Sequence, residues 1–206
     1  MKKPATEDMA SGRNARLAGL GRAAAECFGG RNMPEFDPEA FKQALQDLKK
    51  IVRALPGAYA VIVGGLALQE WGYERYTEDI DVVVDAANFG AVTERLRRLG
   101  YDITPERNLR HRETKIEIDL LKEGAQLKGS VSPLPHPREL GRNLGFASLP
   151  ALIALKLNGN RRRDLADVVE LLKRHPREIE KITAVLPAAL QAKFIQLAEE
   201  ARQEMS

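Results

Sequence analysis

The chain has 206 residues, 44% of them hydrophobic, which is enough for one packed domain with an accessory segment but too few for several independent domains. Its 32 basic and 29 acidic residues leave a surplus too small to predict nucleic-acid binding by itself. A single cysteine excludes both an intramolecular disulfide and a thiolate zinc site. Because no apolar run reaches membrane-spanning length and the basic start has no signal-peptide core, we expect a soluble, cytoplasmic protein with no membrane partner.

The first element with a clear beginning is a helix at Asp37–Pro38. An N-cap side chain stands there before a proline at the first helical position, and apolar residues recur at helical spacing up to Leu55. Residues 1–35 mix Gly, Ala, Arg and Ser and are interpreted as a loosely attached extension. After the helix, residues 59–63 form a short branched apolar run that predicts a buried strand, which Gly64–Gly65 ends in a turn.

Helix and strand patterns alternate along the middle of the chain, and helices alone fill its end. Before residue 122 we expect a helix over 66–71, a strand over 80–84, a helix over 88–99, and strands over 101–103, 110–113 and 115–121. Residues 122–147, rich in Gly and Pro, are predicted to form a loop with room for one short strand. Further helices are expected over 148–157, 163–174, 176–186 and 187–203.

This order of elements predicts an α/β (α+β) fold in which helices flank a short mixed sheet. The expected organisation has three parts: an extension over 1–35, a core over 36–147 and a helical C-terminal region over 148–206.

Two aspartates introduce the strand predicted over 80–84. Asp79 and Asp81 project from the same face, because successive side chains of a strand alternate. Carboxylates this close repel each other, which usually implies a cation between them, and hard oxygen ligands favour magnesium. Asp119 supplies a third carboxylate if its strand pairs with that of Asp79, and Glu117 on the same face is the fallback ligand. Three carboxylates suit two Mg²⁺ ions and an in-line phosphoryl displacement.

Gly64–Gly65 lies where the first predicted strand gives way to a helix. Without side chains the backbone can approach a phosphate closely, and the free amides of a helix start attract an anion. We therefore predict a phosphate loop at Gly64–Gly65 and, with the metal site, a bound nucleoside triphosphate. Arg75 and Thr77 stand just before the aspartates, where they either hold phosphate oxygens or brace the loop. The sequence leaves these two roles open.

Together these motifs resemble a known superfamily. Gly-Gly is followed after nine residues by Arg-x-Thr-x-Asp-x-Asp, an apolar strand and a later Ile118-Asp119-Leu120. The pattern is similar to that of the DNA polymerase beta-type nucleotidyltransferases, and within them to the minimal nucleotidyltransferases, the AbiEii-like toxins and the aminoglycoside or lincosamide nucleotidyltransferases. The apolar segment around Lys156, followed by Arg161-x-Arg163-Asp164-x-x-Asp167, extends the resemblance over residues 40–172. Arg163 stands where relatives often carry lysine.

The resemblance implies magnesium-dependent transfer of a nucleoside monophosphate from a triphosphate to an acceptor hydroxyl, with release of pyrophosphate. It implies that Asp79 and Asp81 hold two Mg²⁺ ions and that Asp119 helps to activate the acceptor. By the same likeness Lys156 would touch the triphosphate, and the cluster formed by Arg163, Asp164 and Asp167 would be structural or substrate-facing. A toxin-like enzyme would modify tRNA or a partner protein and would have a cognate antitoxin.

Other classes of protein share parts of this pattern. A haloacid-dehalogenase phosphatase carries its aspartates after an apolar strand, whereas here the apolar run follows them, and an EF-hand would need an oxygen ligand in place of Val83. An antibiotic-modifying nucleotidyltransferase would need an acidic pocket for a cationic drug, which Glu113 and Glu117 do not clearly make. A nucleotide- or partner-binding module without turnover is the non-enzymatic alternative.

Overall fold

The computed structural model describes residues 37–205, so the extension predicted over 1–35 lies outside the described residues. Within this range five strands form one mixed sheet in the order β1-β2-β5-β4-β3. Their bounds are β1 (Ala60–Ile62), β2 (Asp79–Val84), β3 (Tyr101–Ile103), β4 (Leu109–His111) and β5 (Glu117–Lys122). β2 and β5 are parallel, and the other neighbouring strands are antiparallel.

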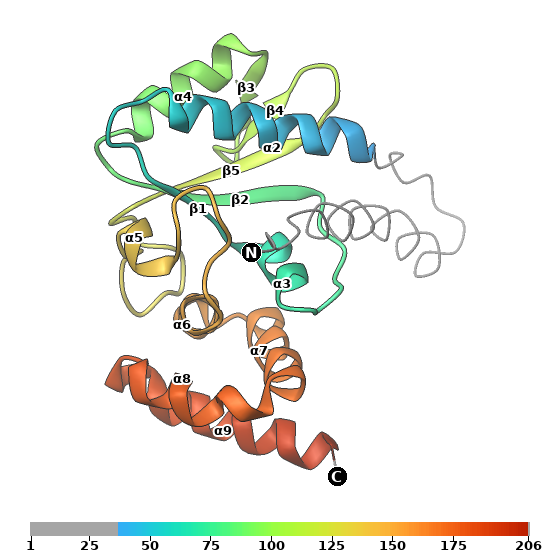
Figure 1. Cartoon of the computed structure of the whole chain (residues 1–206), viewed down its shortest axis with the longest axis vertical. Helices are drawn as coiled ribbons and strands as arrows, with labels where there is room; N and C mark the ends of the chain where they lie inside the picture. The colour runs from blue at the N-terminus through green and yellow to red at the C-terminus, as the bar shows by residue number, and fades with distance from the viewer. Residues whose placement is uncertain (1–36, 206) are drawn as a thin grey trace, which may run out of the picture.

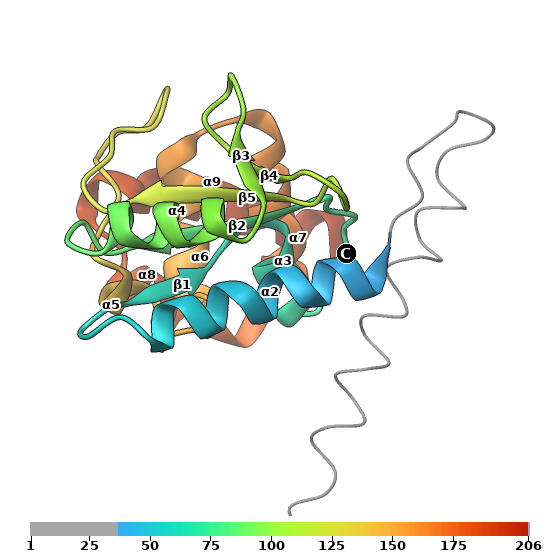
Figure 2. The ribbon, with the colours of Figure 1, turned by 90° about the horizontal axis from the view of Figure 1, so that it is seen from above.

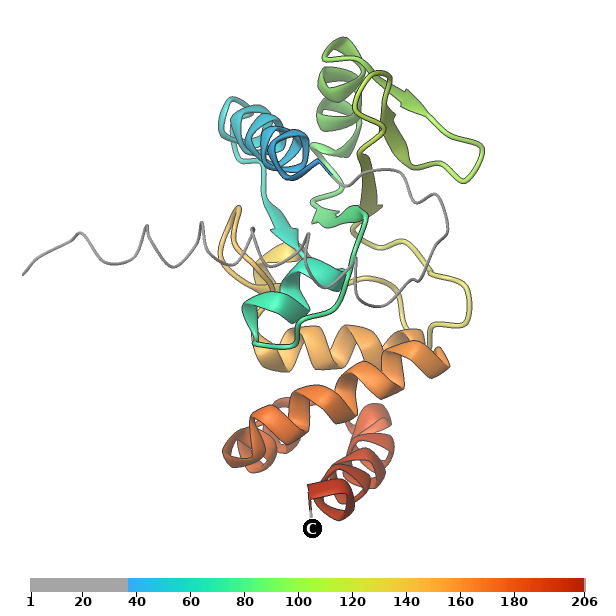
Figure 3. The same cartoon turned by 90° about the vertical axis from the view of Figure 1, so that its right-hand side faces the viewer.

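Helices cover both faces of the sheet (Figures 1 and 3). On one face α2 (Pro38–Arg53) and α4 (Phe89–Arg98) lie side by side, as the view from above shows (Figure 2). The other face carries α3 (Gly64–Glu70) and α6 (Leu149–Gly159), followed by α7 (Arg162–Arg174), a 3₁₀ turn η1 (Pro176–Glu178), α8 (Ile179–Val185) and α9 (Ala188–Met205). This arrangement confirms the predicted fold class, in which helices flank a short mixed sheet.

The start of α2 shows the predicted cap. The Asp37 carboxylate accepts hydrogen bonds from the amides of Glu39 at 2.9 Å and Ala40 at 3.1 Å, and Pro38 takes the first helical position. The helix is held on the sheet by its apolar stripe, in which Phe41, Ala44, Leu48 and Val52 are buried.

Side-chain alternation divides β2 between two apolar cores. Ile80, Val82 and Val84 belong to the core shared with α2 and α4, whereas Val83 packs in the core shared with α3 and the C-terminal helices. Because Asp79 and Asp81 have the parity of Val83, they point toward α3, α6 and α7. The apolar pattern of this strand therefore decides which side of the sheet carries the acidic residues.

The C-terminal helices do not stand apart from the sheet. Leu152 and Val168 share one apolar cluster with Leu68 of α3 and Val83 of β2. The predicted boundary at 147/148 stays a prediction, although packing is continuous across it. Within residues 37–205, no helix is both long and apolar enough to cross a membrane.

Two local predictions were wrong. The segment predicted as loop contains a helix, α5 (Pro137–Leu140), which is too short to show a helical period and is capped by reciprocal hydrogen bonds between His136 and residues 138 and 139. In place of the short strand allowed there, the segment makes two isolated bridges, one between Ile62 and Phe146 and one between Gly141 and Ala147. In addition, α3 begins at Gly64 and not at Leu66, so Gly64–Gly65 forms the first turn of the helix.

Candidate functional site

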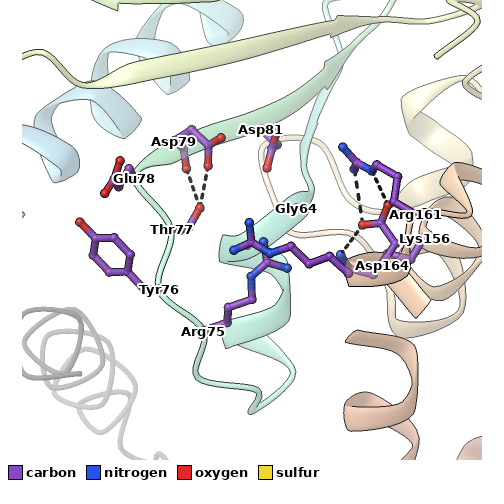
Figure 4. A pocket seen from close by; sticks show the side chains of 12 residues that line it. Gly64, Arg75, Tyr76, Thr77, Glu78, Asp79, Asp81, Lys156, Arg161 and Asp164 are labelled. Carbon is purple, nitrogen blue, oxygen red and sulfur yellow. Dashed lines mark hydrogen bonds and ion pairs between the residues drawn. The ribbon is translucent and has the colours of Figure 1, made fainter. Parts of the chain in front are cut away.

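A cavity of about 460 Å³ lies between β2, the segment that leads into it, and the turn from α6 to α7. This volume is in the range of small-molecule sites, roughly 300–1,000 Å³. Figure 4 shows Asp79 and Asp81 projecting from β2 on one side, and Lys156, Arg161 and Asp164 on the other. We call these the acidic side and the basic side of the cavity.

The acidic side is assembled by the pairing of β2 with β5. The parallel register places Asp81 beside Asp119 and Asp79 beside Glu117, which confirms that the two predicted strands are neighbours. Asp79 and Asp81 line the cavity, whereas Asp119 lies outside its lining. Glu117, the predicted fallback ligand, pairs with Arg110 at 3.5 Å.

Negative charge on the acidic side is incompletely balanced. Burial, together with repulsion by Asp79 and Asp119, raises the pKa of Asp81 to about 7, while Lys156 and the Gly65 amide act in the opposite direction. Burial and the charge of Asp79 also raise the pKa of Asp119, and Arg161 opposes this shift. A cation placed among these carboxylates would relieve the repulsion.

The donor chemistry of the acidic side fits magnesium. Mg²⁺ prefers hard oxygen ligands and commonly uses one or two carboxylates, completed by water and substrate phosphates. In the described part of the chain, no three His, Cys, Asp or Glu side chains are grouped so as to hold a metal ion as they stand. Asp79 is already engaged, since its Oδ1 accepts a hydrogen bond from the Thr77 hydroxyl at 2.7 Å. Asp79, Asp81 and Asp119 are the residues that could hold the ion.

Gly64 and Gly65 are required by close packing against the acidic side. A Cβ on Gly64 would lie 1.7 Å from Asp81 Oδ2, and one on Gly65 would lie 2.5 Å from the Thr77 Cβ. The Gly65 amide also donates a hydrogen bond to Asp81. The glycine pair thus lets Asp81 and Thr77 pack directly onto α3. Its predicted contact with phosphate stays a prediction.

The basic side is built around a buried lysine. Lys156 Nζ lies 2.6 Å from Asp167 Oδ2 and 3.2 Å from Asp164 Oδ1, and its side chain is only 7% exposed. Asp167 also accepts a hydrogen bond from Arg75, and Asp164 accepts one from Arg161 Nε at 2.6 Å. These five residues form one chain of ion pairs, Arg75–Asp167–Lys156–Asp164–Arg161, which we call the ion network.

A tight turn between α6 and α7 brings the network together. Asn160 ends α6 in the left-handed conformation, with φ 49°, so the chain reverses within two residues. Gly159 lets the turn approach Asp164, whose Oδ2 would lie 3.0 Å from a Cβ at that position. Asp164 and Asp167 are one helical turn apart on α7 and therefore both face Lys156.

The structure gives Arg75 and Thr77 bracing contacts. Arg75 joins Asp167, its carbonyl accepts a hydrogen bond from Gln69 at 2.7 Å, and its buried Nε has no partner among the described residues. Thr77 is buried and orients Asp79. Substrate contact by either residue stays a prediction.

Sequence reasoning missed two residues that line the cavity, Tyr76 and Glu78. Strand alternation would place them on the face opposite Thr77 and Asp79, but residues 73–77 have no regular secondary structure, so alternation does not apply before β2. Burial and the neighbouring Glu78 raise the pKa of Tyr76 to about 12. In the sequence, Tyr76 and Glu78 are marked only by their positions between the motif residues Arg75, Thr77 and Asp79.

Comparison with known proteins adds little to this geometry. No protein-family model and no curated protein matches the chain. Among solved structures, the antibiotic-resistance factor ANT(2'')-Ia matches over 80% of this chain and 97% of its own, at 15% identity and a TM-score of 0.43. The narrower likeness to AbiEii-like toxins stays a prediction.

Proposed function

We propose that the protein transfers a nucleoside monophosphate from a nucleoside triphosphate to an acceptor hydroxyl. The observation that carries this proposal is the division of one cavity into a side with Asp79 and Asp81 and a side with exposed Arg161 and Arg163. A magnesium triphosphate carries charge of both signs, so its metal ions match the acidic side and its phosphate oxygens match the basic side.

In the proposed reaction the acceptor oxygen attacks the α-phosphorus. The bond from this phosphorus to the bridging oxygen of the β-phosphate breaks, and pyrophosphate leaves with the electron pair. Asp119, which lies beside Asp81 on the neighbouring strand and outside the cavity lining, orients an acceptor hydroxyl bound at that edge of the cavity and takes its proton, which then passes to water. Asp79 and Asp81 would hold two Mg²⁺ ions. When bound, these ions would neutralise the negative charge of the phosphates. Thr77 keeps Asp79 turned toward the site.

The acceptor in this proposal is a hydroxyl of tRNA or of a partner protein, as in toxin-like enzymes. A cognate antitoxin and a cytoplasmic site of action belong to the same proposal. The two acceptor classes separate in an assay that offers each of them alone.

The test is transfer of label from each of the four nucleoside triphosphates, with magnesium, to purified RNA or to a protein extract. Wild-type protein should label one acceptor class. A variant with both Asp79→Asn and Asp81→Asn should lose at least about 1,000-fold in rate, since metal ligation contributes several kcal/mol to such reactions. Asp102→Asn, a change at an exposed aspartate that does not line the cavity, is the matched control and should keep full activity.

Absence of label with the wild-type protein in every combination would refute the proposal. Equal labelling by the double variant would refute the assignment of Asp79 and Asp81.

A further inference from the structure

Among the described residues, four basic side chains line the cavity: Arg75, Lys156, Arg161 and Arg163. Two of them are committed to the protein itself. Lys156 is buried between two carboxylates, and Arg75 is tied to Asp167, whose side chain is 2% exposed. Withdrawing Lys156 toward a ligand would leave Asp164 and Asp167 with less compensation in a buried setting, which is costly.

The other two cations are available to solvent. The Arg161 side chain is 76% exposed, and its one carboxylate partner within residues 37–205, Asp164, is shared with Lys156. Arg163 is exposed, and no acidic side chain of residues 37–205 forms an ion pair with it. Within residues 37–205, the basic groups of the cavity whose charge is least balanced by carboxylates are therefore Arg161 and Arg163, at the start of α7.

These exposed cations belong to the same electrostatic site as the acidic side. Burial raises the pKa of Asp119 and Arg161 opposes this shift, while the pKa of Arg161 itself is raised, first by its hydrogen bond to Asp164 and also by the charge of Asp81. A phosphate group placed between Arg161 and Asp81 would thus meet a guanidinium on one side and, with magnesium bound, a cation on the other. Guanidinium groups suit this role because they donate several parallel hydrogen bonds to phosphate oxygens.

We propose that Arg161 and Arg163 are the residues that contact the triphosphate, and that Lys156 is a positioning residue that holds α6 against α7. This inference rests on the proposed function, and it gives Lys156 a role different from the triphosphate contact that the resemblance implied. The ion network fixes the turn from which both arginines reach the cavity.

The experiment measures binding of the magnesium complexes of ATP, GTP, CTP, UTP and inorganic tripolyphosphate to the full chain by calorimetry. Arg163→Gln should weaken binding about 10-fold, and Arg161→Gln with Arg163→Gln roughly 100-fold, because each removes a charge-assisted hydrogen bond. Arg162→Gln is the matched control, since this neighbouring arginine is exposed and does not line the cavity. It should bind within about twofold of wild type.

Thermal unfolding separates contact from positioning. Arg163→Gln should keep the wild-type melting temperature, because its side chain is exposed and forms no ion pair within the described chain. Lys156→Met should lower the melting temperature, because it leaves the two carboxylates without their shared partner. The inference is overturned if Arg163→Gln and the double arginine variant bind as tightly as wild type, or if Lys156→Met melts as wild type does while its binding is lost.

The outcomes for the two proposals can be told apart. Arginine-dependent binding of tripolyphosphate without any transfer of label would uphold this inference and refute the proposed function. If the arginine variants transferred label as fast as the wild type, the proposed function would be upheld and this inference refuted. A wild-type protein that binds none of the triphosphates would refute both.

Discussion

Gly64 is the position where the site leaves least room for a side chain. Its φ of +59° costs about 1–2 kcal/mol for other residues, and a Cβ there would overlap Asp81 Oδ2. We expect Gly64→Ala to lower the free energy of unfolding by more than about 2 kcal/mol, because backbone strain and displacement of Asp81 add together. Denaturant unfolding measures this change.

Gly90 provides the matched control for this substitution. It lies in the first turn of α4, and a Cβ there would meet nothing within 4 Å. Gly90→Ala should keep or slightly raise stability, by up to about 0.5 kcal/mol, through helix propensity, which counts less in the first turn than in a helix interior. If the two alanine variants were equally stable, crowding at Gly64 would not be the reason for its glycine.

At the scale of the elements, Asp85 directly follows β2 and links this strand to the starts of β1 and α4. Its carboxylate accepts hydrogen bonds from the Tyr59 amide before β1 at 2.7 Å and from the Asn88 amide before α4 at 3.0 Å. Burial alone would raise the pKa of Asp85, but these bonds and the Asn88 side chain lower it below its usual value. Asp85→Asn should therefore cost about 1–2 kcal/mol at pH 7, where an amide donor would face the Tyr59 amide.

The pH dependence of this effect has a definite sign. A lowered folded-state pKa gives stability that is present above the unfolded value, about 3.9, and is lost as the pH falls through the folded value. The difference between wild type and Asp85→Asn, measured by denaturant unfolding from pH 7 down to pH 3, should thus shrink below about pH 4. A difference that stays constant over this range would contradict the assignment. Asp102→Asn, at an exposed ion pair with Arg112, should have a smaller effect throughout.

The sequence predicted those elements whose pattern is local. The alternation of residues 115–121 predicts a strand that carries Asp119 on its polar face, but its pairing beside Asp81 stayed a condition in the sequence, and the register of β2 with β5 fulfils that condition. The helix α5 could not, because four residues span only about one helical turn. Only the resemblance predicts Lys156 as a site residue, whereas its burial between two carboxylates depends on the α6–α7 turn.

Across the whole molecule, sequence patterns say least about contacts between distant segments. Arg75 and Asp167 are 92 residues apart in the chain, and no periodicity relates them. Arg174 Nε at the end of α7 likewise donates to the Gly72 carbonyl at 3.0 Å. Such contacts attach the segment before β2 to the C-terminal helices, so the two sides of the cavity are positioned by one connected structure. Because the apolar core is also shared, we expect the described chain to unfold as one unit.

Asp167 is the residue on which this connection can be tested. Asp167→Asn removes the charge that Arg75 and Lys156 share, and breaking a buried pair in this way should lower the free energy of unfolding by about 3 kcal/mol or more. Glu170→Gln on the same helix is the matched control, because Glu170 also has two basic partners, Lys173 and Arg174, but at the surface; its loss should not exceed about 1 kcal/mol. Denaturant unfolding followed by both circular dichroism and Trp71 fluorescence should give coincident single transitions for the wild type and both variants. Equal losses in the two variants, or separate transitions for the two probes, would show that the ion network does not join the sheet to the C-terminal helices.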